Sequence, residues 1–464
     1  MPPALDEILA IAGFAPAGVT IEGRDPVLPT PFRIGEAGGA AIAAAAVAAA
    51  EVWAVRRGRA RQGVAIDLRH AVASLRSNRY LRIDGAPPKP VFDAVSGLYP
   101  APQGRWVFLH CNFPHHRQAA LGVLGLADGA SRESVAAAVA ARDGLALEDA
   151  IHAAGGCAAF VRSREEWAAH AQSSAVASLP LVEIERIGEA PAEPFARNGE
   201  RPLSGIRVLD LTRVLAGPTA ARTLAEHGAD VLKVSGPHLP HSGDMEIDTG
   251  LGKLSAHLDL RDPAARDRLT HLIRDGRCDV FSQSYRPGTL AARGFGAAEL
   301  AALRPGIIAL ELSAWGREGP WAKRRGFDTI VQSASGMALI EGGGNAPRLL
   351  PVSAIDYISG SLMAFGAMVA LLRRARDGGS WRVRVSLARS GRFIVERGLI
   401  DRAALADVPK EFPEAEIARC SSETASPYGR LRHLTPVARL SETPAHWSRP
   451  PVPLGHDSAE WPAR

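Results

Sequence analysis

The feature that most constrains the fold is an alternation of short apolar runs and helical spacing in the second half of the chain. Residues 206–211 (IRVLDL) and 229–234 (ADVLKV) are typical of buried strands, and residues 219–227 between them have helical spacing. Two further apolar runs, 279–282 and 307–312, extend this strand–helix–strand unit. The pattern predicts an α/β protein with a doubly wound, Rossmann-like parallel sheet.

The loop after the first strand excludes several large enzyme classes. Residues 212–218 (TRVLAGP) hold a single glycine where a dinucleotide-binding turn requires GxGxxG. Walker, HExxH and GxSxG motifs are also missing from the sequence. Nicotinamide dehydrogenases, P-loop NTPases, zinc proteases and the commonest serine hydrolases are therefore disfavoured. No metal site is expected, because metal-ligand spacing is absent around the four cysteines, Cys111, Cys157, Cys278 and Cys420.

The chain divides into four parts. Its 464 residues are too many for one ordinary core. Residues 191–202 (PAEPFARNGERP) are polar and rich in proline, which is typical of a linker. We therefore expect a smaller α+β domain from residues 1–190, a Rossmann-like catalytic domain at 203–393 and a loop-rich tail at 394–464.

A weak internal repeat relates the two halves. Residues 52–68 and 369–387 both have the pattern of a helix end, a basic turn and a strand, at an offset of 317 positions. At that offset Gly39 corresponds to Asp356, so the first copy cannot supply the same carboxylate.

Charge and hydropathy restrict the partners. The net charge is +5, but the basic residues are spread along the chain, which disfavours nucleic acid and suits a small polyanionic ligand. The Ala-rich run 40–50 is followed by Glu51, and we expect a packed helix there rather than a membrane span. The start of the chain lacks signal-peptide features, so a cytoplasmic location is expected.

Seven segments of the second half resemble, in order, the family III coenzyme A transferases. That family includes the carnitine, formate and bile-acid enzymes and the α-methylacyl-CoA racemases. The tail from 426 to 461 is similar to the family's closing segment, and residues 38–190 resemble its later portion, so the halves have a permuted order. The seven segments are PLSGIRVLDLTRVLAGP (202–218), GADVLKV (228–234), SAHLDLRD (255–262), CDVFSQSYRPG (278–288), ARGFG (292–296), RGFDTIVQSASGM (325–337) and AIDYISG (354–360).

The resemblance implies a chemistry and a nucleophile. The family's nucleophilic aspartate, which opens a long helix after a loop, corresponds to Asp356. A helix N-terminus stabilises a carboxylate, and a carboxylate attacks a thioester without losing a proton first. The implied reaction moves coenzyme A between an acyl-CoA and a carboxylic acid through an aspartyl-CoA thioester. It needs no permanently bound cofactor, and the implied assembly is an interlocked homodimer.

Motif positions also imply the residues that bind coenzyme A. Phosphates and a pantetheine arm require arginines, backbone donors and an apolar slot. Four residues depart from the family's pattern and bear on nucleotide binding: Ser235, Gly236, Leu254 and Ser284. The candidates are Val214, Leu215, Leu258, Arg261, Ser284, Tyr285, Arg293 and Arg325.

Two alternatives stay open. An acyl-CoA racemase or isomerase of the same superfamily would place a histidine where this chain has Phe327, which disfavours two-base proton transfer. A non-catalytic CoA-binding member would explain the departures. We interpret Asp328 as a cap of the helix that follows it. The histidines of the first half, His110, His115 and His116, are interpreted as polar residues at a strand end.

Overall fold

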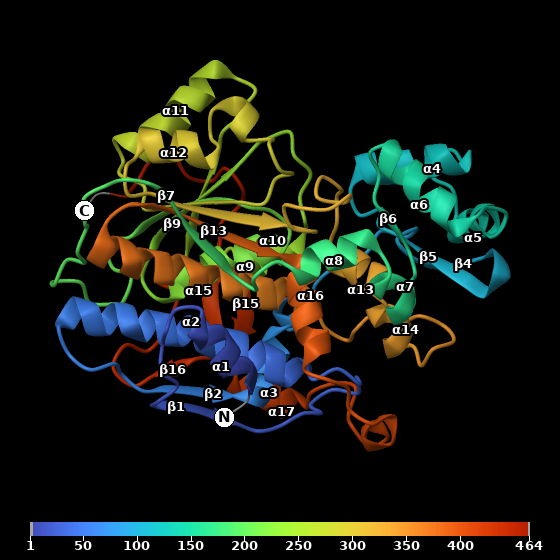
Figure 1. Cartoon of the computed structure of the whole chain (residues 1–464), viewed down its shortest axis with the longest axis horizontal. Coiled ribbons are helices and arrows are strands. Elements are labelled where there is room, and N and C mark those ends of the chain that lie inside the picture. The colour runs from blue at the N-terminus through green and yellow to red at the C-terminus, as the bar shows by residue number, and fades with distance from the viewer. Residues whose placement is uncertain (1–2, 463–464) are drawn as a thin grey trace.

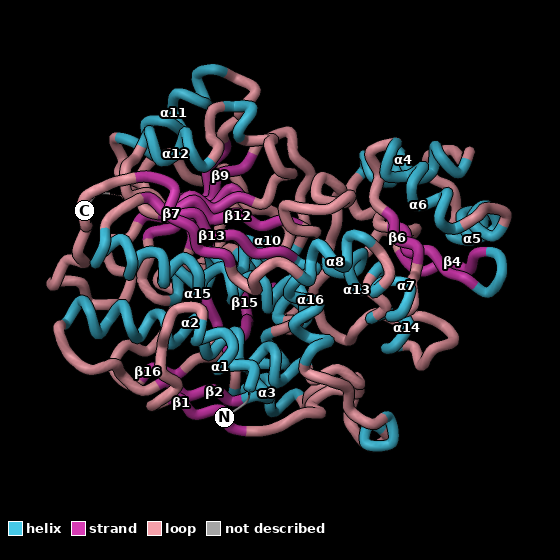
Figure 2. The backbone as a smooth tube through the Cα atoms, in the orientation of Figure 1, coloured by secondary structure: helices cyan, strands magenta, loops and turns pink. Residues whose placement is uncertain are grey.

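A seven-stranded sheet forms the centre of the computed structural model, which describes residues 3–462 (Figure 2). The strand order is β10-β9-β8-β11-β12-β13-β7, and the first six strands are parallel. Their order along the chain is that of the Rossmann fold, with β7 added antiparallel to β13 at the edge. The predicted α/β class and mostly parallel sheet are confirmed. The strands are β7 (Glu183–Gly188), β8 (Arg207–Leu211), β9 (Asp230–Ser235), β10 (Lys253–His257), β11 (Val280–Gln283), β12 (Ile308–Ser313) and β13 (Ser380–Ser386).

Helices cover both faces of this sheet (Figure 1). On one face α11 (Pro263–Arg274) and α12 (Ala297–Leu303) bury a compact apolar cluster. On the other face α9 (Ala216–Glu226) and α15 (Ala354–Asp377) pack together, and α2 (Ile34–Arg57) lies against α15. The central strands β8, β9, β11 and β12 are largely buried because both faces are covered.

Helices α2 and α15 are the two longest helices, and they form the larger core. Both are long and apolar enough to span a membrane by length and composition, but 83% and 94% of their most apolar windows are buried inside the protein. Each is followed by a strand and a helix: β2 (Val64–Asp67) and α3 (Leu68–Ser74) after α2, and β13 and α16 (Leu387–Glu396) after α15. The predicted helix–turn–strand repeat is therefore present.

A smaller α+β lobe stands at the right of Figure 1. Its antiparallel sheet has the order β4-β5-β6, and it has a hydrophobic cluster of its own. The elements of the lobe are β4 (Gly97–Ala101), β5 (Arg105–Leu109), β6 (Ala158–Phe160), α4 (Pro114–Leu124), α5 (Arg132–Ala140) and α6 (Gly144–Ala153).

The first 190 residues are divided between this lobe and the main body. Strand β7 extends the large sheet, and β2 pairs with β16 (Arg439–Leu440) from the tail. The buried guanidinium of Arg56 in α2 donates to main-chain carbonyl groups of the expected linker, including that of Pro202. The boundary expected at residue 190 thus does not separate two independently packed units.

The remaining elements are short. They are α1 (Pro3–Ala10), β1 (Val19–Glu22), β3 (Arg82–Ile83), α7 (Arg164–Ala168), α8 (Ala171–Ala177), α10 (Asp244–Thr249), α13 (Asp328–Ala334), α14 (Met337–Glu341), α17 (Glu414–Arg419), β14 (Ser421–Ser426), β15 (Gly429–Leu434) and the 3-10 turns at 77–79, 102–104, 291–293 and 402–405.

Candidate active site

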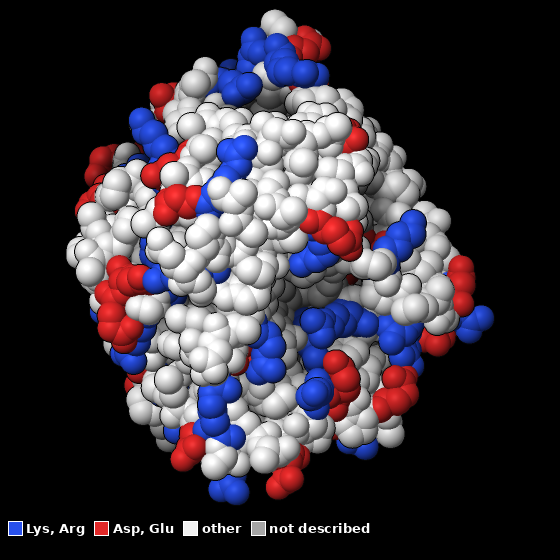
Figure 3. All heavy atoms as spheres, turned by 90° about the vertical axis from the view of Figure 1, so that its right-hand side faces the viewer, with Lys and Arg blue, Asp and Glu red and all other residues white. Residues whose placement is uncertain are grey.

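A cavity of about 470 Å³ opens beyond the carboxyl ends of the parallel strands. The loops after β8 and β11 both line it, and the strand order reverses between these two neighbours. Open α/β sheets bind ligands at such a switch point. The face at the right-hand side of Figure 1 is hollowed near its centre, and Lys and Arg side chains lie around the hollow (Figure 3). The basic residues lining the cavity are Arg213, Arg286, Arg324 and Arg325.

The loop after β8 is held in an unusual conformation. Val214 has φ 71°, which is a rare and strained value for a β-branched residue. The N–H of Arg213 donates to Ser284 Oγ at 3.1 Å, which ties this loop to the one after β11. Helix α9 begins directly afterwards, at Ala216, so its N-terminus lies at the cavity wall.

Asp356 lies in the first turn of α15 and reaches the same cavity. Its residue surface is only 8% exposed. The N–H of Asp356 donates to Oδ2 of Asp328 at 3.1 Å. Asp328 therefore caps α15, 28 residues further along the chain. The sequence-based prediction that Asp328 caps the helix that follows it, α13, is wrong. Asp328 is the first residue of α13, and the N-cap position belongs to Phe327, whose side chain makes no capping hydrogen bond.

Both carboxylates hold their protons more tightly than free carboxylates do. Burial raises the pKa of Asp356 well above its usual range, and the neighbouring charge of Asp328 raises it further. Burial raises the pKa of Asp328 to about 6, although hydrogen bonds from Gln332 and the backbone of Asp356 oppose the shift. No salt bridge reaches Asp356 or Asp328 within residues 3–462. Two buried carboxylates without a cation are typical of reactive sites rather than of structural ones.

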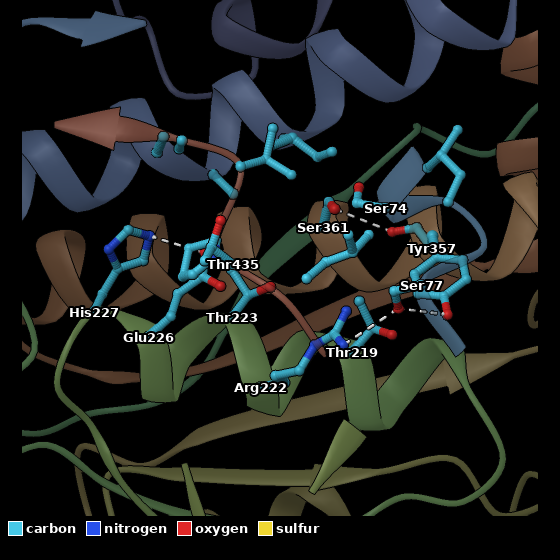
Figure 4. A pocket seen from close by; sticks show the side chains of 18 of the residues that line it. Ser74, Ser77, Thr219, Arg222, Thr223, Glu226, His227, Tyr357, Ser361 and Thr435 are labelled. Carbon is cyan, nitrogen blue, oxygen red and sulfur yellow. Dashed lines mark hydrogen bonds and ion pairs between the residues drawn. The ribbon is translucent and has the colours of Figure 1, made fainter. Parts of the chain in front are cut away.

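A polar network surrounds Tyr357, the residue that follows Asp356 in α15; Figure 4 shows Tyr357, Ser77 and Arg222 of this network. Tyr357 points to Ser77, and their hydroxyl oxygens are 3.0 Å apart. Ser77 donates to Asp248, which accepts a second hydrogen bond from Arg222 at 2.8 Å. The network borders a small cavity of about 50 Å³ between α9 and α15. Because the buried Arg222–Asp248 pair fixes Ser77, it also fixes the turn that presents Asp356.

Most of the CoA-binding residues predicted from sequence lie at one cavity. Five of the eight line this cavity together with Asp356: Val214, Leu215, Ser284, Tyr285 and Arg325.

The other three predicted residues lie outside the lining. Arg261 forms an exposed ion pair with Asp259, which in turn lies 3.4 Å from the rim residue His238. Arg293 donates to the main chain of Thr289, another lining residue. Leu258 is partly buried against the sheet core behind the site.

Sequence reasoning missed the part of the wall that the smaller lobe supplies. Phe113, His115 and His116 come from the start of α4 and line the cavity. His116 is buried, and neither of its ring nitrogens has a hydrogen-bond partner among residues 3–462. Burial lowers the pKa of His116 to about 2, so its imidazole is neutral. The sequence signal for this part of the wall was a pair of adjacent histidines, His115 and His116, directly after Phe113 and Pro114.

The sheet order and the cavity at its switch point define a doubly wound α/β protein with a cavity at the carboxyl ends of its strands, where proteins of this architecture bind ligands. The model of CoA-transferase family III matches residues 203–424. This match covers just under half of the chain, and it confirms the resemblance inferred from the seven segments.

Several proteins are similar to this chain. The acetyl-coenzyme A transferase nodX of Hypoxylon pulicicidum is 36% identical over 213 residues, which are 44% of this chain and 35% of that protein. An acyl-CoA transferase of Gibberella moniliformis is 28% identical over 429 residues, 80% of this chain and 75% of that protein. The human succinyl-CoA:glutarate CoA-transferase is 32% identical over 194 residues, 39% of this chain and 44% of that protein.

A solved structure is also similar, that of Rv3272 from Mycobacterium tuberculosis. It has 30% sequence identity and a TM-score of 0.39, and the match covers 43% of this chain and 58% of that one. The chain spans less than half the length of the Hypoxylon and human relatives.

Proposed function

We propose that this protein is a coenzyme A transferase that moves CoA between an acyl-CoA and a carboxylic acid, with Asp356 as the covalent nucleophile. One observation supports this most strongly: five of the predicted CoA-binding residues, from three separate motifs, line one cavity with Asp356. The family of residues 203–424 and the CoA transferases among the similar proteins support the same reaction class.

The proposed reaction has four steps that balance without ATP or an added oxidant. The Asp356 carboxylate attacks the thioester carbonyl of the donor, the C–S bond breaks, and CoA leaves as a thiolate. The thiolate then attacks the aspartyl carbonyl of the mixed anhydride and releases the donor acid. The acceptor carboxylate attacks the carbonyl of the aspartyl-CoA thioester, the C–S bond breaks, CoA leaves again as a thiolate, and a second anhydride forms. Finally the thiolate attacks the new acyl carbon, which frees Asp356.

The residues around Asp356 suit these steps. Attack requires the ionised carboxylate, and the raised pKa of Asp356 makes that carboxylate more basic and more nucleophilic once it has formed. The N-terminal turn of α15 faces the negative charge that develops on the carbonyl oxygen. The arginines at the cavity, among them Arg213 and Arg325, suit the phosphates of CoA.

Trapping tests the proposal directly. Hydroxylamine or borohydride, added together with acyl-CoA, should modify the protein at Asp356, and peptide mass spectrometry should find no modification without acyl-CoA. The racemase alternative forms no such adduct and would exchange the α-hydrogen of a 2-methylacyl-CoA with deuterium from solvent. Rapid exchange without an Asp356 adduct would overturn the transferase assignment. CoA binding without trapping on any acyl-CoA would favour the non-catalytic alternative.

The assembly and location stay predictions. We infer an interlocked homodimer and a cytoplasmic location from the resemblance and from the sequence. Light scattering at micromolar concentration tests the first, because a monomer alone would contradict it. Cell fractionation tests the second.

A further inference from the structure

Three rings from two parts of the fold form an aromatic wall on the Asp356 cavity. The wall consists of Phe113, His116 and Phe327, and all three residues line the cavity. Phe113 and His116 come from the start of α4 in the smaller lobe, whereas Phe327 is the N-cap of α13 in the main body. The ring centroids are 5.5 to 6.0 Å apart, which is the spacing of interacting aromatic rings.

The aromatic wall lies beside the proposed nucleophile. Phe327 directly precedes Asp328, and Oδ2 of Asp328 accepts a hydrogen bond from the N–H of Asp356 at 3.1 Å. Phe327 and Asp356 also line the same cavity. An acyl group whose carbonyl carbon is held at Asp356 therefore extends into a space that the Phe327 ring borders.

The Phe327 ring is accessible and held in one orientation. Phe327 is half-buried and lines the cavity, so a ligand can touch its ring. The buried ring of His110 stacks on Phe327 with centroids 3.8 Å apart and planes 3° from parallel. A Cβ atom at Gly326 would lie 2.7 Å from that of Ala314, so glycine allows the loop before Phe327 to pack closely. The ring is thus positioned before any ligand binds.

The aromatic wall carries no charge. Burial lowers the pKa of His116 to about 2 and that of His110 to about 4, so both imidazoles are neutral at physiological pH. An aromatic ligand gains edge-to-face or offset-stacked contacts with such rings in addition to burying apolar area. A saturated ligand of the same size gains only the burial. The wall therefore favours an aromatic group.

We propose that the aromatic wall is the subsite for the acyl group and that the enzyme prefers aromatic acids, whose ring packs against Phe327, to aliphatic acids of the same size. The proposal rests on the proposed function, because it takes the acyl group to be bound at Asp356. It assigns a substrate class, aromatic acids, to that site.

Calorimetry with a matched pair of thioesters tests the proposal without turnover. Benzoyl-CoA and cyclohexanecarbonyl-CoA differ only in whether the acyl ring is aromatic, and both are titrated into the Asp356→Asn variant. One aromatic contact corresponds to roughly a fivefold change in Kd, so we expect benzoyl-CoA to bind about fivefold more tightly. Phe327→Leu, added to Asp356→Asn, should reduce this preference to about twofold or less and leave the affinity for free CoA unchanged.

Two further variants separate the aromatic ring from packing in general. Phe327→Tyr keeps a ring in the wall and should keep the preference. Phe92 is the matched control, because its ring is 46% exposed and it is not among the residues that line the Asp356 cavity. Phe92→Leu should leave the preference unchanged. Thermal unfolding of each variant checks that the protein is folded.

The outcomes separate the two proposals. Equal affinity for both thioesters, a preference that survives Phe327→Leu, or one that Phe327→Tyr also removes would overturn the aromatic subsite and leave the transferase proposal standing. If Phe327→Leu weakens free CoA as much as benzoyl-CoA, the wall packs the adenine of CoA, and the subsite is overturned in the same way. Binding of neither thioester would overturn both proposals, because the CoA site itself would then be wrong.

Discussion

Two buried carboxylate sites lie on the large sheet and its helices, and they differ in what neutralises them. Asp210 in β8 is fully buried and accepts a hydrogen bond from the buried Lys253 at 2.8 Å. Burial alone would raise its pKa, but the charges of Lys253 and Lys233 outweigh burial and lower it. Asp356 is nearly as buried, yet the nearest charge that shifts its pKa is another carboxylate, Asp328.

The difference separates a structural carboxylate from a reactive one. The Asp210–Lys253 pair joins β8 to β10, and Lys253 also donates to the carbonyl of Pro218 in α9. The Asp210–Lys253 pair therefore holds β8 in place, and the loop that follows β8 forms part of the cavity wall. Among residues 3–462 no comparable cation pairs with the carboxylate of Asp356. Its charge, once formed, is therefore available to a substrate, at a cost in stability. Four predictions test this contrast.

The largest expected effect is on turnover. Asp356→Asn should lower kcat by about 10³-fold or more, because the amide cannot attack a thioester. CoA affinity measured by calorimetry should change little, since the proposed role of Asp356 is to attack the acyl carbonyl and not to bind the phosphates. The matched change Asp210→Asn should leave the turnover of folded protein within about tenfold. Near-normal turnover of Asp356→Asn would show that another group is the nucleophile.

The second prediction concerns stability. Lys253→Met leaves Asp210 buried with only the more distant Lys233, and an uncompensated buried charge costs about 3–5 kcal/mol. Urea unfolding should show that loss at pH 7. Adding Asp210→Asn should restore part of it, because the buried charge is then gone. Arg261→Ala, which breaks only the exposed pair with Asp259, is the control and should cost under about 1 kcal/mol. An equal loss from both single changes would contradict the contrast.

The sequence predicted the sheet more completely than the site. Apolar runs located β8, β9, β11 and β12 to within one residue, because these central strands are largely buried and read as continuous runs. The nucleophile candidate and five wall residues followed from local motifs. His116 and the role of Asp328 did not, because each depends on contacts between segments far apart in the chain. Likewise β7 joins the large sheet across the expected linker, which no local pattern indicates.

The third prediction is a pH dependence of stability. The pKa of Asp356 is raised in the folded protein, so the stability contributed by its protonated form is fully present below the unfolded-state pKa of about 4 and is lost as the pH rises through the folded value. Asp356→Asn cannot ionise and keeps that stability. It should therefore exceed the wild type by about 1 kcal/mol or more at pH 8, and the difference should shrink toward pH 4. A difference independent of pH between 4 and 8 would rule out the raised pKa.

The smallest expected effect comes from Asp328→Asn, which removes the charge beside Asp356 but keeps an oxygen that can cap α15. Burial is the main cause of the raised pKa of Asp356 and the Asp328 charge is the second, so only part of the shift should disappear.

The pH dependence of turnover reports this shift. Attack requires the ionised Asp356, so kcat/KM should rise with pH through that pKa. In Asp328→Asn this acid limb should move to lower pH, by about one unit or less. The pH profile of kcat/KM measures the shift, and thermal unfolding checks that the cap survives. Gln332→Leu deletes a donor to Asp328 and no charge. The lost hydrogen bond lowers the pKa of Asp328 in the wild type, so in this variant Asp328 is neutral more often, and the limb should move in the same direction as in Asp328→Asn but by less. A limb that moves to higher pH in Asp328→Asn would mean that the two carboxylates do not repel each other, and the contrast with Asp210 would then rest on burial alone.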